Sequence, residues 1–273
     1  MTSWQERLEI DRFRRAQIKI GMEVDSLIRR EWARLSVDDI DAGRDLMLEK
    51  VTTRIHSLRR VAAADAQRYV RNMRTLAVVG AGPVEVPGLF LPASDVLALE
   101  LAGPAGFKTR VGKGVIDEVA FLAARDQMMA EARKIIMQSG RDTVRLSAEA
   151  YGRAIGYRRV SDGDPCAFCA MLVGRGPVYK SEDTSRGSVE RIGRSGDWEL
   201  IYHNHCGCTA VEIFNDDWTP TEAEERFVDD YQAAAEAADA AGVPRTYDNI
   251  LPAMRRDGKY KDSPSRRSKT PTI

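Results

Sequence analysis

Two short clusters of cysteine and histidine constrain the fold of this chain more than any other feature of its sequence. The first is the C-x-x-C segment 166–169, and the second is the segment 203–208, which spells HNHCGC. Zinc takes four nitrogen or sulfur ligands in a tetrahedron, and two such clusters on either side of a loop can supply them. The sequence therefore predicts a zinc site with six candidate ligands: Cys166, Cys169, His203, His205, Cys206 and Cys208.

The preferred ligand set is Cys166, Cys169 and Cys206 together with either His203 or Cys208. A second imidazole, that of His205, leaves the choice among the six open. Four protein ligands leave no position for a water molecule, so such a site is structural and not catalytic. Disulfides, or a chance clustering of cysteines, are the alternatives.

The expected compartment argues against the disulfides. Residues 1–15 are charged and lack the apolar core of a signal peptide, so we expect the protein to stay in the cytoplasm where it is made. Reducing conditions there disfavour structural disulfides. No apolar run approaches the roughly 20 residues that a bilayer span needs, so no membrane partner is expected.

The first half of the chain reads as helical. Apolar residues recur at three-to-four spacing over 4–35 and 37–76, which predicts two long helices in an antiparallel hairpin, the second capped by Ser36. Glycine and proline predict irregular loops over 80–92 and 103–114. Further helices are predicted over 94–101, 115–138 and 142–155.

The second half is rich in glycine and turn residues up to Phe214, and the apolar runs 176–179 and 208–214 predict short strands. An acidic helix is predicted after Thr219, ending near Ala241. The stretch from Arg255 to Ile273 is basic and rich in serine and proline, which predicts disorder.

These patterns together predict an α+β protein that is predominantly α-helical, with a helical N-terminal half and a small Cys/His-stapled domain with a few short strands. The predicted boundaries are a helical region 1–140, a Cys/His domain 141–214, an acidic helix with its connection 215–252, and a basic tail 253–273.

Two enzyme signatures are incomplete. The C-x-x-C segment matches half of the zinc deaminase signature, but the other half needs H-x-E upstream, and the one upstream histidine, His56, precedes Ser57 and Leu58. The letters HNH at 203–205 are contiguous, whereas the nucleases of that name disperse these residues over a larger unit.

Lys and Arg (41) balance Asp and Glu (41), so net charge does not indicate a nucleic-acid partner. The basic 255–273 tail is the candidate for contact with double-stranded DNA.

The motifs resemble those of phage Mu F-like minor head proteins, in the actinobacteriophage branch. Arg141-Asp142-Thr143 leads into a predicted helix, and the segment Asp162 to Cys169 has aspartates shortly before the C-x-x-C. The spacing of the second cluster also matches, at His203, Cys206 and Cys208. The run CAFCAML at 166–172, with RGP at 175–177, is similar to that branch. The resemblance covers about residues 140 to 214.

The resemblance implies a minor capsid, or head morphogenesis, protein that joins the procapsid near the portal and ends in the virion, at the capsid interior or portal vertex. Its implied partners are the portal protein and the major capsid or scaffold protein. Relatives at this position are sometimes labelled capsid maturation proteases, so a protease is the alternative function. The required serine with histidines finds little support, because His56 falls on a predicted helix and the other histidines lie among the cysteines. A zinc-containing nuclease or DNA-binding head protein is the second alternative.

Overall fold

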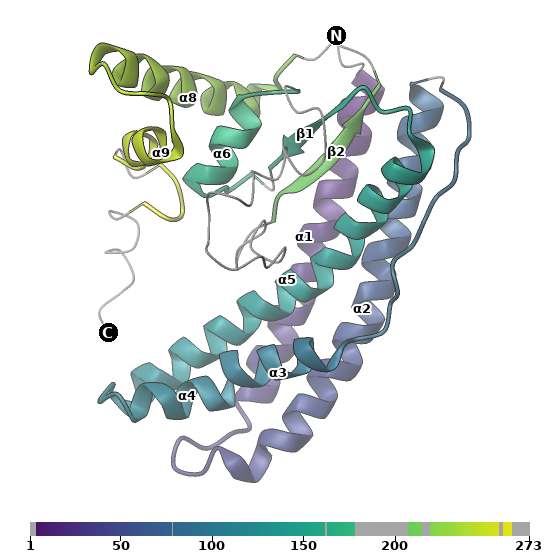
Figure 1. Ribbon diagram of the computed structural model, residues 1–273. Helices are drawn as coiled ribbons and strands as arrows, with labels where there is room; N and C mark the ends of the chain where they lie inside the picture. Colours follow the sequence, from purple (N-terminus) through teal and green to yellow (C-terminus); the bar gives the residue numbers. More distant parts are fainter. Residues whose placement is uncertain are drawn as a thin grey trace.

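The structure is a computed structural model that describes residues 4–77, 79–161, 163–177, 207–214, 219–256 and 259–263. Figure 1 shows long helices packed along one another, with a small sheet and the C-terminal helices gathered at one end. The described residues form helices and one two-stranded antiparallel sheet. The predominantly helical α+β class predicted from the sequence is therefore confirmed.

Three long helices build the body of the molecule: α1 (Trp4–Trp32), α2 (Asp41–Leu76) and α5 (Asp117–Tyr151). Each presents a stripe of apolar side chains at helical spacing, and burying these stripes against one another forms the main core. Central members of that core are Val24, Ile28, Trp32, Val51, Ile55, Leu58, Ala124, Met128 and Ile136. The predicted hairpin of α1 and α2 is present.

The start of α2 differs from the prediction. Ser36 does not cap this helix, because its hydroxyl accepts the backbone N–H of Asp38 within the connection. The helix begins later, at Asp41, and the carboxylate of Asp39 accepts the N–H of Ala42 in the first turn. The connection between α1 and α2 is therefore longer than the sequence pattern indicated.

The predicted loop over 103–114 is wrong. After α3 (Ala93–Ala102), the helix α4 (Pro104–Val111) packs on α5, with Pro104 in its first turn, where a missing N–H costs nothing. Gly106 serves packing: a Cβ there would lie 2.6 Å from the carbonyl oxygen of Leu101. Gly106 thus accommodates a close approach within a helical segment.

The break predicted near residue 140 is also absent, because α5 runs from Asp117 to Tyr151 without interruption. Gly140 lies inside this helix, and a Cβ there would stand 3.2 Å from the carbonyl oxygen of Ala62 on α2. A glycine here lets two long helices approach each other closely, which outweighs its weak helix propensity.

The C-terminal region contains β1 (Gly156–Val160), α6 (Ala167–Gly174), β2 (Thr209–Ile213), α8 (Glu222–Ala240) and α9 (Tyr247–Arg255). The strands pair antiparallel, with Gly156 opposite Ile213 and Val160 opposite Thr209. The strand predicted over 208–214 is therefore confirmed. Gly176 and Pro177 of the other predicted strand are not in a strand, and its last two residues lie outside the described residues. The sequence did not predict β1, α6 or α9.

The acidic helix α8 begins two residues later than predicted. Thr221, not Thr219, is its N-cap: the Thr221 hydroxyl accepts the N–H of Glu224, and the Glu224 carboxylate accepts the N–H of Thr221. This reciprocal arrangement is a capping box, which satisfies two backbone donors at the helix start.

The sheet lies between the long helices and the C-terminal helices (Figure 1). Val160 and Val211 share a buried cluster with Phe13 of α1 and Tyr69 of α2, whose rings stack at 4.6 Å. Tyr157 packs instead into the cluster formed by α6, α8 and α9. Among the described residues, no helix is both long and apolar enough to cross a membrane.

Candidate metal centre

The C-x-x-C segment forms the N-terminal turn of α6. Cys166 is the N-cap residue in an extended conformation, and its sulfur accepts the backbone N–H of Cys169 at 3.4 Å. Both thiols therefore lie at the N-terminal end of a helix, where the helix dipole favours negative charge. Such surroundings suit thiolates, the form of cysteine that binds metal.

The third cysteine reaches the same place from the sheet. Cys208 directly precedes β2, and its carbonyl oxygen accepts the Nε–H of Arg141 from α5 at 3.1 Å. Cys166, Cys169 and Cys208 form one cluster, each at most 2% exposed, with the ring of Phe168 packed against it. No disulfide joins these three to one another.

The structure thus brings together three of the six predicted ligands. The other three, His203, His205 and Cys206, lie outside the described residues. The described residues alone contain no group of three His, Cys, Asp or Glu side chains arranged to hold a metal ion. These three candidates precede Cys208 in the chain, separated from it by Gly207.

A segment from the C-terminus closes over the start of α6. Asp262 accepts the N–H of Ala167 at 2.8 Å through one carboxylate oxygen and the Nε–H of Arg255 at 2.8 Å through the other. Burial alone would raise the pKa of Asp262, but these hydrogen bonds and the Arg255 charge hold it below its ordinary value. The N–H of Lys261 also reaches the carbonyl of Pro165, at 3.5 Å.

The contact of Asp262 with the start of α6 was not predicted, because the composition of the basic tail predicted disorder for all of it. Tyr260 is 2% exposed: its ring packs near Phe227, and its hydroxyl donates to Asp230 on α8 at 2.5 Å. One aromatic residue within a polar stretch was the available signal that part of this tail docks. Residues 264–273 lie outside the described residues.

The sequence that forms these helices and strands identifies the family of the chain. The model of the VG15 protein family matches residues 5–234, from the first turn of α1 into α8. The chain belongs to the VG15 protein family. This family consists of viral gene products of phage type, and the match supports a phage origin. No curated protein and no solved structure matches the chain.

The VG15 match spans the long helices and all three clustered cysteines, whereas the Asp262 closure lies beyond it. It also spans two buried ion pairs that tie the sheet to its neighbours. On β1, Arg158 pairs with Glu224 of α8 at 2.9 Å. On β2, Glu212 pairs with Arg74 of α2 at 3.1 Å.

Arg74 is the more connected member of these pairs. Its guanidinium donates to the carbonyls of Pro83 and Ser147, each at 2.6 Å, and lies over the ring of Tyr151 at 4.1 Å. Burial raises the pKa of Glu212 above its ordinary value, although Arg74 opposes this shift. Desolvation of the Glu212 carboxylate thus outweighs its attraction to Arg74.

The three thiols fit zinc in chemical type. Sulfur ligands in a buried pocket, with an N–H group directed at one sulfur, are typical of structural zinc sites, where surrounding hydrogen bonds stabilise the thiolates. His56, the remaining histidine, lies on α2.

Proposed function

We propose that this VG15 family member is a minor capsid, or head morphogenesis, protein of a tailed phage. It would dock at the portal in the interior of the procapsid and become part of the virion. The observation that supports this proposal best is that Cys166 and Cys169 converge with the distant Cys208 in a chain that belongs to a phage protein family. Phage Mu F-like minor head proteins carry cysteines with this spacing.

In this proposal a structural zinc ion is held by Cys166, Cys169 and Cys208, with His203, His205 or Cys206 as the fourth ligand. When bound, zinc supplies a crosslink between α6 and the start of β2. The protein's own contribution is the helix N-terminus, the Cys169 N–H directed at Cys166, and the Arg141 contact that fixes the Cys208 backbone. Binding of the ion contributes folding free energy by joining elements that are distant in the sequence.

The metal proposal is tested by elemental analysis of purified protein together with thermal melting. We expect about one zinc per chain, and a lower Tm after treatment with a strong chelator. Cys169→Ser should lose the zinc, whereas Leu172→Met, a volume-conserving change at a buried position of the same helix, should keep it. Stoichiometric zinc in Cys169→Ser, or a melting curve that chelation leaves unchanged, would overturn the proposed site.

The assembly proposal is tested separately, in phage particles. We expect cryo-EM of procapsids to place this chain at the portal vertex in few copies, and co-expression to recover it with the portal protein or with the major capsid or scaffold protein. Procapsids of normal composition that lack the chain would contradict the proposal. Cleavage of the major capsid protein in the co-expression, dependent on a serine or histidine of this chain, would instead establish the protease alternative.

A further inference from the structure

Charged side chains are sorted by sign on one half of the α1–α2 hairpin. Over residues 4–22 and 54–76, every exposed charged side chain is basic. The acidic side chains of the same ranges, Glu6, Glu9, Asp11 and Asp65, are buried or half-buried. This sorting contrasts with a chain in which basic and acidic residues are equal in number. The exposed basic residues are Arg7, Arg12, Arg15, Lys19, Arg54, Arg60, Arg68 and Arg71.

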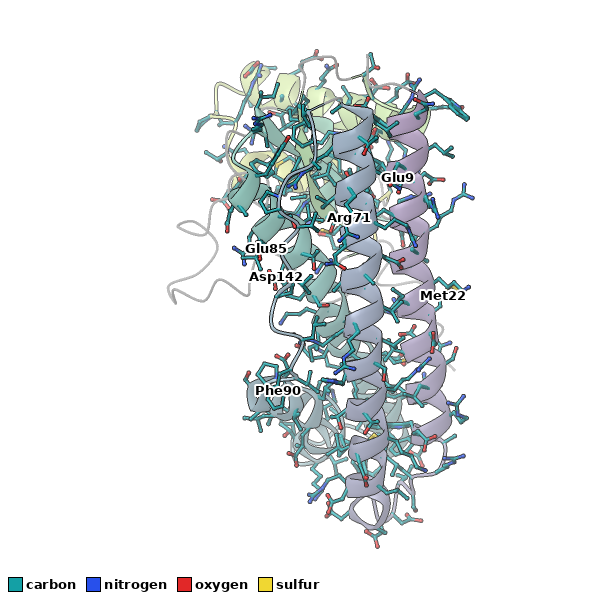
Figure 2. All side chains as sticks on the ribbon, turned by 90° about the vertical axis from the view of Figure 1, so that its right-hand side faces the viewer. Glu9, Met22, Arg71, Glu85, Phe90 and Asp142 are labelled. Carbon is teal, nitrogen blue, oxygen red and sulfur yellow. The ribbon has the colours of Figure 1, made fainter. Side chains whose placement is uncertain are left out.

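Contacts between the two helices set these cations side by side. The Asn72 side chain donates to Glu9 at 3.0 Å, and Phe13 stacks on Tyr69, so the start of α1 lies beside the end of α2. Figure 2 shows α1 and α2 adjacent along their length, with Glu9 and Arg71 labelled in this half.

Helical spacing then gathers the cations into stripes. Arg12, Arg15 and Lys19 follow one stripe of α1, and positions 60, 68 and 71 follow one stripe of α2. We name the surface that these stripes form the basic face, and its residues are Arg12, Arg15, Lys19, Arg60, Arg68 and Arg71.

The cations of the basic face are available for an external anion. Among described residues, Lys19, Arg60 and Arg71 form no ion pair. Arg15 and Arg68 pair at 2.7 Å only with carboxylates of their own helices, and the Arg12 pair is longer, at 3.8 Å. Exposed pairs of this kind contribute little free energy, so their cations can turn to a stronger anionic partner.

The other half of the hairpin shows that this sorting is local. There Asp41, Asp45 and Glu49 are exposed along α2 and alternate with the cations of both helices. Asp41 pairs with Lys108 of α4, and Asp45 with Arg44. Among the described residues of the hairpin, a surface whose exposed charges are all positive therefore lies near the sheet end.

We propose that the basic face binds the phosphate backbone of double-stranded DNA without reading its sequence. Packed helices lie about 8–10 Å apart, so the face is two helices wide and too broad for a major groove that admits one helix. Contacts would go to phosphates, for which arginine is well suited because its planar guanidinium can bind two oxygens at once. This inference goes beyond the proposed assembly role, and it requires neither the zinc ion nor the 255–273 tail.

The test uses the full chain and a fluorescent duplex, with anisotropy measured over a salt series. The variant Lys19→Gln/Arg71→Gln removes one lysine and one arginine of the basic face, neither of which forms an ion pair with a described residue. The matched control Arg29→Gln/Lys113→Gln removes the same charges from exposed positions elsewhere. We expect the face variant to bind at least about tenfold more weakly at low salt, with the slope of log K against log salt reduced by about 2. The control should change little.

Four results would overturn the proposal. The first is an equal loss in the control variant, and the second is no binding of duplex by the unmodified chain at low salt. The third is full binding by the face variant with loss in Arg266→Gln/Arg267→Gln/Lys269→Gln, which would assign DNA contact to the tail. Competition by poly-glutamate as strong as that by duplex would indicate an acidic protein partner and would also count against DNA. Circular dichroism melts confirm that the variants remain folded.

Discussion

The long-helix region and the C-terminal region of this protein are held together in different ways. Helices α1, α2 and α5 bury a continuous core of large aliphatic side chains, such as Val24, Ile28 and Ile55, with none of these three measurably exposed. The C-terminal region has five-residue strands and the eight-residue helix α6, and much of its core is alanine, as at Ala170 and Ala234.

This difference teaches where specific polar contacts are needed. A buried alanine contributes less hydrophobic free energy than a leucine or isoleucine, because it removes less apolar area from water. The C-terminal region compensates with directed contacts: the cysteine cluster, the Arg158–Glu224 and Arg74–Glu212 pairs, and the Asp262 closure. We therefore expect the long helices to respond to lost volume, and the C-terminal region to respond to lost polar partners.

The largest effect is expected where the two regions meet, at Arg74. The change Arg74→Met leaves Glu212 buried without its cation and the carbonyls of Pro83 and Ser147 without their donor. Breaking a buried pair in this way costs about 3–5 kcal/mol of unfolding free energy. Denaturant unfolding at neutral pH measures this loss.

The matched change Glu212→Gln should cost much less, because burial already disfavours the charged carboxylate, as its raised pKa shows. The sign of the pH dependence follows. The folded state holds the proton more tightly, so the contribution of Glu212 is greatest below its ordinary pKa of 4.5 and falls as pH rises through the raised value. Glu212→Gln should lack this fall, and losses of equal size in the two variants would contradict our account.

A smaller but still large effect is expected in the long helices. Ile55 on α2 is fully buried, and Ile55→Ala removes side-chain volume from the middle of the main core. Changes of this type cost about 2–5 kcal/mol. Hydrogen exchange should show lost protection in α1, α2 and α5 together, whereas chelation should lower protection mainly around α6 and β2. Ile55→Val is the conservative control, with an expected cost of about 1 kcal/mol.

The same contrast explains what could be predicted from the sequence. The two longest helices of the first half were found because their apolar periodicity is sustained over many turns. Helix α4 was missed because Gly106 looks like a loop residue, although it is required by the nearby Leu101 carbonyl. Gly140 likewise indicated a break between helices, although the contact that requires a glycine there is with the Ala62 carbonyl on another helix. Contacts of this kind leave no local pattern in the chain.

The candidate site was predictable by residue type and only partly by position. The spacing of cysteines and histidines predicted six candidate ligands, with Cys166, Cys169 and Cys206 preferred and Cys208 an alternative to His203. The fold brings Cys166, Cys169 and Cys208 together. The start of α6, which orients Cys166 and Cys169, was not predicted, because segment 166–174 is apolar throughout and too short to show a helical periodicity. Asp262 lies almost a hundred residues further along the chain, and nothing in its neighbourhood indicates that it contacts Ala167.

Helix capping gives a medium-sized test confined to the C-terminal region. Thr221→Ala removes the hydroxyl that accepts the Glu224 N–H, and the loss of an N-cap costs about 1 kcal/mol. Thr246 is a matched control, because it occupies the N-cap position of α9 in the same extended conformation without a side-chain hydrogen bond. Chemical denaturation should show a clear loss for Thr221→Ala and a smaller one for Thr246→Ala. Equal losses would show that the capping box contributes nothing beyond intrinsic propensity.

The smallest expected effect is at Asp262, where its dependence on pH distinguishes the closure from the Arg74–Glu212 pair. The pKa of Asp262 is lowered, so its stabilising contribution is present above its ordinary value of 3.8 and is lost as pH falls through the lowered value. Asp262→Asn should therefore destabilise the protein modestly at neutral pH, by about 1 kcal/mol or less, and the difference from the unmodified chain should shrink in acid. Asp38→Asn, which removes one carboxylate from an exposed position in the connection before α2, is the control for the loss of a surface charge. A difference that stays constant from neutral to acidic pH would mean that Asp262 acts through its shape alone, and the start of α6 would then not depend on the carboxylate charge.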